Sequence, residues 1–191
     1  MPTQPKSFLT PQEYLAIERE AEFKSEYWNG EMFAMVARGE PHADICVNVI
    51  AQMWQQLRAG PCKIYGQDMR VRTSSNLYTY PDGVVVCGER LFLDGGRDTL
   101  LNPNLIVEVL SDGAEGNDRG VKFEQYRTIK PLREYLMLAS DRIHAELFTR
   151  QPNGQWTLSE WNAPEAVVPL ESCDCRLKLA DVYEKVEFLT E

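Results

Sequence analysis

The feature that most constrains the fold of this chain is the apolar run Leu105-Ile106-Val107-Glu108-Val109-Leu110. A continuous run rich in β-branched residues is typical of a buried strand. The chain has 191 residues, enough for one domain with a sizeable core. Glu108 lies within the run, where an ionised side chain is costly unless it is paired or binds a cation. The run therefore predicts a buried strand and is also the main clue to function.

The segments before this run carry helix and turn signals. Thr10-Pro11-Gln12-Glu13 combines a cap, a proline and a first-turn acid, and it predicts a short helix to about Glu22. Asn29-Gly30 between apolar flanks predicts a β-hairpin, because both central turn positions need positive φ. A second helix is expected from Pro41 to the Gly60-Pro61 pair. Its buried stripe recurs every four residues and consists of Ile45, Val49, Met53 and Leu57.

The remaining elements follow from apolar runs between turn residues. The expected strands cover residues 62–72, 84–87, 104–110, 134–139 and 167–170, and a C-terminal hairpin is expected to pair 143–150 with 155–161. Helices are expected over 118–129 and 179–186. The mixture predicts an α/β (α+β mixed) class with a mixed sheet. Residues 1–9 are expected to be a flexible tail and residues 10–191 a single domain.

Charge and hydropathy exclude several classes of protein. The formal net charge of −9 argues against a large basic face for nucleic acid. It leaves room for a small metal-assisted site, where cations offset local carboxylates. No apolar run is long enough to cross a bilayer, and the N-terminus lacks the pattern of a secretory signal. We therefore expect no membrane association and a cytoplasmic location.

The five cysteines are expected to be reduced, because their number is odd and no secretory context accompanies them. Cys46, Cys62 and Cys87 lie in apolar surroundings, which predicts core positions. Cys173-Asp174-Cys175 holds the one close pair. With only two histidines in the chain, a structural zinc site is not expected.

Several polar residues are candidates for one site. Asp82 precedes the strand 84–87, and neighbouring strands tend to lie side by side, so Asp82 and Glu108 are expected to meet at one end of the sheet. Carboxylate oxygens gathered at one point suit Mg²⁺ or Mn²⁺. Lys122, on the following helix, would hold water or stabilise charge on phosphate. Glu26 is a further candidate carboxylate, and His42 a candidate for phosphate contact or proton transfer.

Each candidate also has a structural explanation. Asp82 after Pro81 shapes a turn with Gly83 in the simplest interpretation. Glu108 would need an edge position or a structural ion pair. The other three would be a solvated helix lysine (Lys122), a hydrogen-bonded helix-start residue (His42) and a surface acid (Glu26). The ordered set, rather than any single member, carries the functional interpretation.

The ordered motifs resemble those of the Uma family, restriction-endonuclease-like proteins of the PD-(D/E)xK nuclease superfamily. The resemblance covers roughly residues 10 to 150. Its motifs are Ser25–Glu31, Pro41–Ile45, Tyr80-Pro81-Asp82, Leu105–Ser111, Asp118–Tyr126 and Glu134-Tyr135.

The resemblance implies a restriction-endonuclease-like mixed β-sheet flanked by helices and a divalent-metal phosphodiesterase site. Asp82 and Glu108 would bind Mg²⁺ or Mn²⁺, aided by the Val109 carbonyl. The superfamily pattern places a lysine two residues after the glutamate, where this chain has Leu110. Lys122 would serve instead, from the following helix.

Three functions follow as hypotheses. The first is a Mg²⁺-dependent DNA endonuclease, with a homodimer as the expected assembly because two cuts in a duplex need two sites. The second is a nuclease-like fold that binds a partner without catalysis, which the net charge and Leu110 favour. The third is a metal-free hydrolase that uses Asp82 and Glu108 as an acid–base pair.

Overall fold

A six-stranded mixed sheet forms the centre of the computed structural model, which describes residues 8–110 and 118–188. The strands lie in the order β11-β10-β9-β8-β6-β3, with β8 and β9 parallel and the other neighbours antiparallel. Their bounds are β3 Cys62–Tyr65, β6 Gly83–Cys87, β8 Leu105–Leu110, β9 Glu134–Ala139, β10 Ala145–Arg150 and β11 Trp156–Trp161. Both the predicted mixed sheet and the predicted buried strand are confirmed.

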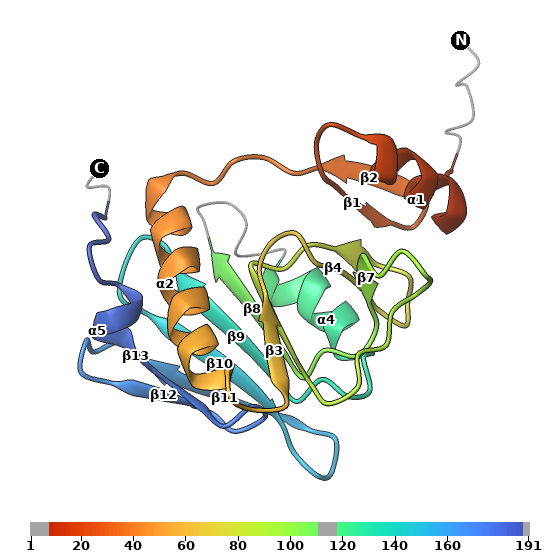
Figure 1. Cartoon of the computed structure of the whole chain (residues 1–191). Helices are drawn as coiled ribbons and strands as arrows, with labels where there is room; N and C mark the ends of the chain where they lie inside the picture. Colours follow the sequence, from red (N-terminus) through yellow and green to blue (C-terminus); the bar gives the residue numbers. More distant parts are fainter. Residues whose placement is uncertain (1–7, 111–117, 189–191) are drawn as a thin grey trace.

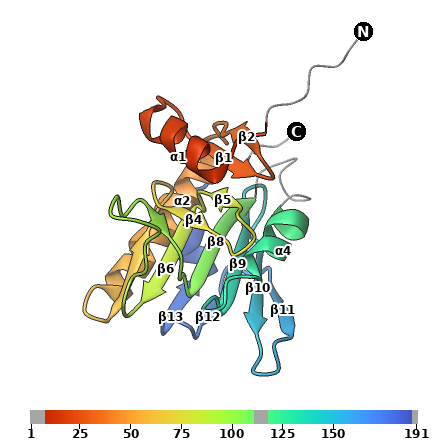
Figure 2. The ribbon, with the colours of Figure 1, turned by 90° about the vertical axis from the view of Figure 1, so that its right-hand side faces the viewer.

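Helices cover both faces of this sheet (Figures 1 and 2). Helix α2, Glu40–Leu57, lies on one face, and its predicted stripe packs against Leu105, Val107 and Val109 of β8. The alternate β8 residues Ile106 and Leu110 belong to the core on the opposite face, with Phe123 and Tyr126 of α4 (Phe123–Tyr126). Helix α4 directly follows η1 (Asp118–Lys122). The period of two along a strand therefore divides β8 between two cores.

A second, five-stranded sheet lies at one end of the central sheet, in the order β2-β1-β5-β4-β7 (Figure 2). Helix α1, Pro11–Glu20, packs on it through a cluster of Tyr14, Tyr27 and Tyr78. The predicted cap, Thr10, is confirmed, and the structure adds a reciprocal capping box between Thr10 and Glu13. The bounds are β1 Ser25–Trp28, β2 Glu31–Ala34, β4 Arg70–Arg72, β5 Tyr78–Thr79 and β7 Thr99–Leu100.

The C-terminal segment completes the core on the α2 side of the central sheet. Strands β12 (Val167–Leu170) and β13 (Cys175–Lys178) form a hairpin, followed by α5 (Leu179–Val182). The Glu134 carboxylate accepts hydrogen bonds from the backbone N–H groups of Glu171 and Ser172, at 3.0 and 3.1 Å. These bonds attach the β12–β13 turn to β9.

Three predicted elements differ from the structure. The strand expected over 62–72 is divided into β3 and β4, which belong to different sheets. The helix expected to Ile129 ends at Tyr126, where the Thr128 hydroxyl donates to the Gln125 carbonyl at 2.6 Å and competes with the helical pattern. The closing helix ends at Val182, ahead of Lys185 with φ 61°.

Both predicted hairpins are confirmed. Asn29 and Gly30 have positive φ in the β1–β2 turn, and Gly154 has positive φ in the β10–β11 turn. Residues 1–7 of the predicted tail lie outside the described residues. Leu9 is held by a hydrogen bond from its N–H to the Gly30 carbonyl at 2.9 Å. In the part of the chain that the structure describes, every helix is too short or too polar to span a bilayer.

The prediction that all cysteines are reduced is wrong for one pair. Cys62 and Cys87 form a disulfide between β3 and β6, where the antiparallel register places them opposite one another. Their separation of 25 residues does not reveal that register. Cys46, Cys173 and Cys175 are free and buried.

Candidate active site

The candidate site lies where β6 begins and β8 ends. The antiparallel register pairs Gly83 with Val107, so Asp82, the residue just before β6, lies close to Glu108 and Val109 of β8. One Asp82 carboxylate oxygen, Oδ2, accepts a hydrogen bond from the Val109 N–H at 2.8 Å. This bond fixes Asp82 to the peptide that follows Glu108. Asp82 and Glu108 are 5% and 0% exposed. Buried carboxyl groups are costly without partners, so the groups around them determine whether this site is stable.

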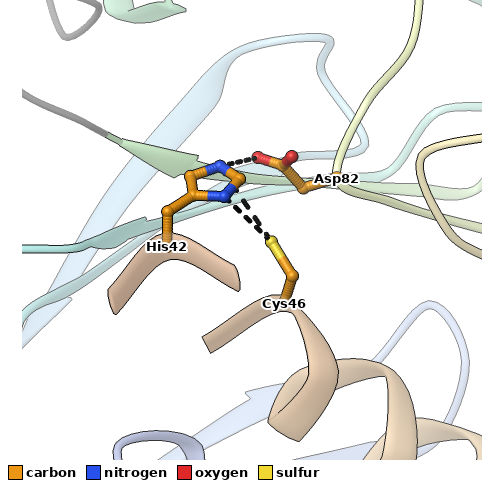
Figure 3. Close-up of side chains that lie close together, drawn as sticks. All are labelled: His42, Cys46 and Asp82. Carbon is orange, nitrogen blue, oxygen red and sulfur yellow. Dashed lines mark hydrogen bonds and ion pairs between the residues drawn. The ribbon is translucent and has the colours of Figure 1, made fainter. Parts of the chain in front are cut away.

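Three side chains from other elements meet the Asp82 carboxylate. His42, in the first turn of α2, places Nε2 3.2 Å from Oδ2 (Figure 3). Gln67, from the β3–β4 turn, donates to Oδ1 at 2.9 Å. Arg38, in the segment before α2, places Nη1 3.4 Å from Oδ2. Asp82 therefore does more than shape a turn with Gly83.

These partners set the charge state of Asp82. Burial is the largest influence on the pKa of Asp82 and would raise it. The hydrogen bond and charge of His42, the charge of Arg38 and the Val109 N–H act in the opposite direction. Together they hold the pKa of Asp82 below its ordinary value. The carboxylate is therefore ionised at neutral pH.

Arg38 was not among the predicted site residues. Its Nη1 also donates to the Val109 carbonyl oxygen, at 3.2 Å, so one cationic nitrogen bridges this oxygen and the Asp82 carboxylate. Both oxygens were predicted to be metal ligands. No sequence signal distinguishes Arg38, because it lies in an irregular segment and reaches Val109 across 71 positions of the chain.

Glu108 has its own partners on the α4 side of β8. Its Oε1 accepts a hydrogen bond from the Tyr126 hydroxyl at 2.8 Å and lies 3.5 Å from Lys122 Nζ. Lys122 Nζ is also 3.0 Å from Glu26 Oε1, which accepts a hydrogen bond from Thr79. Burial above all, and then the charge of Glu108, raise the pKa of Tyr126 well above its ordinary value. Tyr126 is therefore a neutral donor.

These contacts exclude two of the structural explanations considered for Lys122 and Glu108. Lys122 is 3% exposed and is not a solvated helix lysine. Lys122 and Tyr126, four residues apart, both contact Glu108, whereas Gln125 accepts from Ser75 instead. Glu108 lies on a central strand between β6 and β9, so the edge explanation fails. The structural ion pair is present.

The structure thus brings the predicted residues together as two groups on either side of the Val109 peptide. His42 lies with Asp82, and Glu26 lies with Glu108 and Lys122. Among the described residues, only two sets of three or more His, Cys, Asp or Glu have ligand atoms within 4.8 Å of one another: His42, Cys46 and Asp82, and His144, Glu146 and Glu160. A metal ion shared by Asp82 and Glu108 stays a prediction.

A cavity of about 860 Å³ opens on the Asp82 side of this peptide. Its walls are residues 35–40, one face of α2 and residues 66–68 of the β3–β4 turn. Arg38, His42, Cys46, Gln67 and Asp82 all line it. A ligand that enters this cavity therefore meets an ionised carboxylate, an imidazole and a guanidinium before it meets the buried Glu108.

Comparison with known proteins gives concordant results. The Uma2 family model, described as "Putative restriction endonuclease", matches residues 11–180. "Uncharacterized protein slr1290" of Synechocystis sp. is 30% identical over 189 residues, which is 98% of this chain and 97% of that protein. "Uncharacterized protein sll1609" of the same organism is 35% identical over 153 residues, or 80% of this chain and 86% of that protein.

A solved structure shares the fold. It is described as "a putative nuclease belonging to DUF820" from Anabaena variabilis ATCC 29413 and superposes with a TM-score of 0.73. The match covers 92% of this chain and 97% of that chain at 18% sequence identity. The restriction-endonuclease-like fold predicted from the sequence motifs is therefore confirmed.

Proposed function

The chain belongs to the Uma2 family, and we propose that it is a divalent-metal-dependent endonuclease that hydrolyses phosphodiester bonds in DNA. One observation carries the proposal. Near the end of β8, the Asp82 carboxylate and the Val109 carbonyl lie close to Glu108, whose own carboxyl group contacts the buried Lys122. That combination offers hard oxygens for a cation and an amine for phosphate charge.

The oxygens around Val109 fit a divalent cation. Asp82 Oδ2 and the Val109 carbonyl oxygen already share one cationic nitrogen, Arg38 Nη1, at 3.4 and 3.2 Å. Carboxylate and carbonyl oxygens suit Mg²⁺ or Mn²⁺. Asp82, Glu108 and the Val109 carbonyl would hold the ion. When bound, it would polarise a phosphoryl oxygen and lower the pKa of a coordinated water.

The other residues have separate roles in this proposal. Lys122, held by Glu26 and Glu108, keeps an ammonium group inside the site, where it would stabilise charge that develops on phosphate. Glu26 positions Lys122 rather than the substrate. His42 holds Asp82 in its orientation and offers a nitrogen for proton transfer at the cavity wall.

The test of the proposal is cleavage of supercoiled and linear DNA with Mg²⁺ or Mn²⁺. Asp82→Asn keeps the size of the side chain but removes its charge, so cleavage should fall by about 100-fold or more. Chelation should abolish cleavage by the parent protein, and added metal should restore it. Asp141→Asn, at an exposed acid paired with Arg142, is the matched control and should cleave normally. Equal rates for Asp82→Asn and the parent would rule out the proposed role.

A binding module without catalysis is the second candidate. It is favoured by the pairing of both carboxylates with cations of the chain itself, Asp82 with Arg38 and Glu108 with Lys122. Calorimetry with Mg²⁺ and Mn²⁺ separates the two functions. Heat of binding that disappears in Asp82→Ala supports the nuclease, whereas absence of heat in both proteins supports the binding module.

The proposal extends to a homodimer on DNA, because two cuts in a duplex need two such sites. Sedimentation with and without duplex checks this assembly, and a monomer under both conditions would contradict it.

A further inference from the structure

His42, Cys46 and Asp82 form a compact group at the cavity wall (Figure 3). His42 and Cys46 are four residues apart on α2, so both side chains lie on one face of the helix. Cys46 Sγ is 3.6 Å from His42 Nδ1, and His42 Nε2 is 3.2 Å from Asp82 Oδ2. One ligand atom from each residue lies within 4.8 Å of the other two, and all three residues are buried.

The donor set has a distinct chemical preference. An imidazole nitrogen, a thiolate sulfur and a carboxylate oxygen are the three ligand types that zinc takes in proteins. Mg²⁺ and Ca²⁺ prefer oxygen ligands and gain little from the sulfur. Three protein ligands leave a fourth tetrahedral position for water, and the adjoining cavity supplies both space and an entry path.

A cysteine nucleophile is a different explanation of the same three residues. Burial above all, and then the charge of Asp82, raise the pKa of the Cys46 thiol well above its ordinary value. A nucleophilic cysteine needs a lowered pKa, because the thiolate is the reactive form. Cys46 is therefore a protonated thiol in the absence of a cation. A bound cation would remove that proton, as metal binding to thiols does generally.

We propose that His42, Cys46 and Asp82 bind a thiophilic divalent cation of the zinc class, which competes with Mg²⁺ or Mn²⁺ for Asp82. The site itself stands on the geometry of the three side chains, whereas the competition rests on the proposed nuclease function. Arg38 Nη1 lies 3.4 Å from both His42 Nε2 and Asp82 Oδ2, so the cation would replace the guanidinium there. Zinc would thus inhibit the enzyme by occupying Asp82, which the catalytic Mg²⁺ or Mn²⁺ would otherwise bind.

The test of the site uses Co²⁺ as a coloured substitute for zinc, with the full chain in thiol-free buffer. One equivalent should give the thiolate-to-cobalt charge-transfer absorption, and zinc should displace it. Cys46→Ala should lose this absorption. Cys173→Ser, at a buried free cysteine outside the cluster, is the matched control and should keep it. Absence of the band in the parent protein, or its survival in folded Cys46→Ala, would overturn the site.

The second readout is DNA cleavage in Mn²⁺ with increasing zinc. Zinc should inhibit the parent. Cys46→Ala lacks the thiolate ligand, so the same inhibition should need a zinc concentration at least about tenfold higher. Identical zinc sensitivity of the two proteins would overturn the competition. If the parent cuts no DNA, the proposed function fails, but the cobalt spectrum still decides whether the site exists.

Discussion

At the scale of single residues, the site depends on how the chain neutralises two buried carboxylates. The Asp82 carboxylate contacts one backbone N–H and three side chains, and its pKa lies below its ordinary value. Glu108 is held by Lys122, at the end of η1, and by Tyr126, at the end of α4. Partners close to each carboxyl group thus offset the free-energy cost of burying Asp82 and Glu108.

Replacing Arg38 tests its competition with a metal ion. Arg38→Ala removes the cation that bridges Asp82 and the Val109 carbonyl, so Mn²⁺ should bind about tenfold more tightly, roughly 1.4 kcal/mol. Calorimetric titration measures the change. Arg142→Ala, at a half-exposed arginine paired with its neighbour Asp141, is the control and should bind as the parent does. Unchanged or weaker binding in Arg38→Ala would refute the competition.

Replacing Lys122 tests the ion-pair group on the α4 side. Lys122→Met leaves Glu26 and Glu108 without the ammonium between them, so the free energy of unfolding should fall by about 3 kcal/mol. Urea unfolding measures the loss, and Lys130→Met, at an exposed lysine, should change it little. Adding Glu108→Gln to Lys122→Met should recover part of the loss. No recovery in the double variant would show that charge is not the cause.

At the scale of elements, side-chain alternation places the residues of β8, and ion pairs attach the helix α1. The alternation along β8 sends Val107 and Val109 to α2 and Glu108 to α4. Helix α1 is attached to the segment before β7 by Arg19, which pairs with Asp94 and Asp98 at 2.8 and 2.7 Å. Asp98 is also 3.0 Å from the buried Arg70.

The attachment of α1 should depend on pH. The hydrogen bond from Arg19 is the largest cause that lowers the pKa of Asp98, and it also lowers that of Asp94. A lowered acid pKa contributes stability that is present above the unfolded value of about 4 and is lost as the pH falls further. Arg19→Ala should therefore melt about 2–4 °C lower than the parent at pH 7, and this gap should narrow progressively as the pH falls below about 4.

Thermal unfolding across this pH range makes the comparison, with Arg142→Ala as a half-exposed control that should show no such trend. A gap between Arg19→Ala and the parent that stays constant with pH would mean that Arg19 acts through packing rather than through the two carboxylates.

At the scale of the whole molecule, one disulfide-closed loop contains strands of both sheets. The disulfide between Cys62 and Cys87 closes a segment that contains β4 and β5 of the five-stranded sheet, and Asp82 as well. The same segment supplies Gln67 and one wall of the cavity. The geometry around Asp82 thus depends on how this loop is closed.

Opening the loop should lower global stability. A cross-link over 25 residues restricts the unfolded chain, so the Cys62→Ser, Cys87→Ser double variant should lose about 3 kcal/mol in the free energy of unfolding. Urea unfolding with and without reductant measures this effect. Reductant should weaken the parent and leave the double variant unchanged; a parent that is insensitive to reductant would contradict the prediction.

The sequence alone was sufficient to predict the individual helices, turns and buried strand that depend on neighbouring residues. The cap at Thr10, the Asn29-Gly30 turn, the α2 stripe and the apolar run around Glu108 all act over a few neighbouring residues. Short-range sterics, hydrogen bonds and periodicity are sufficient for such features. The buried position of Glu108 also followed from its own flanks.

Only the tertiary structure showed which distant residues contact one another. Cys62 is bonded to Cys87 through the β3–β6 register, Arg38 contacts Val109, 71 positions later in the chain, and residues 62–72 are divided between two sheets. The different partners of the two carboxyl groups, His42 of α2 for Asp82 and Tyr126 of α4 for Glu108, arise in the same way. Such contacts are set by strand order and helix placement over the whole core, and no window of neighbouring residues encodes them.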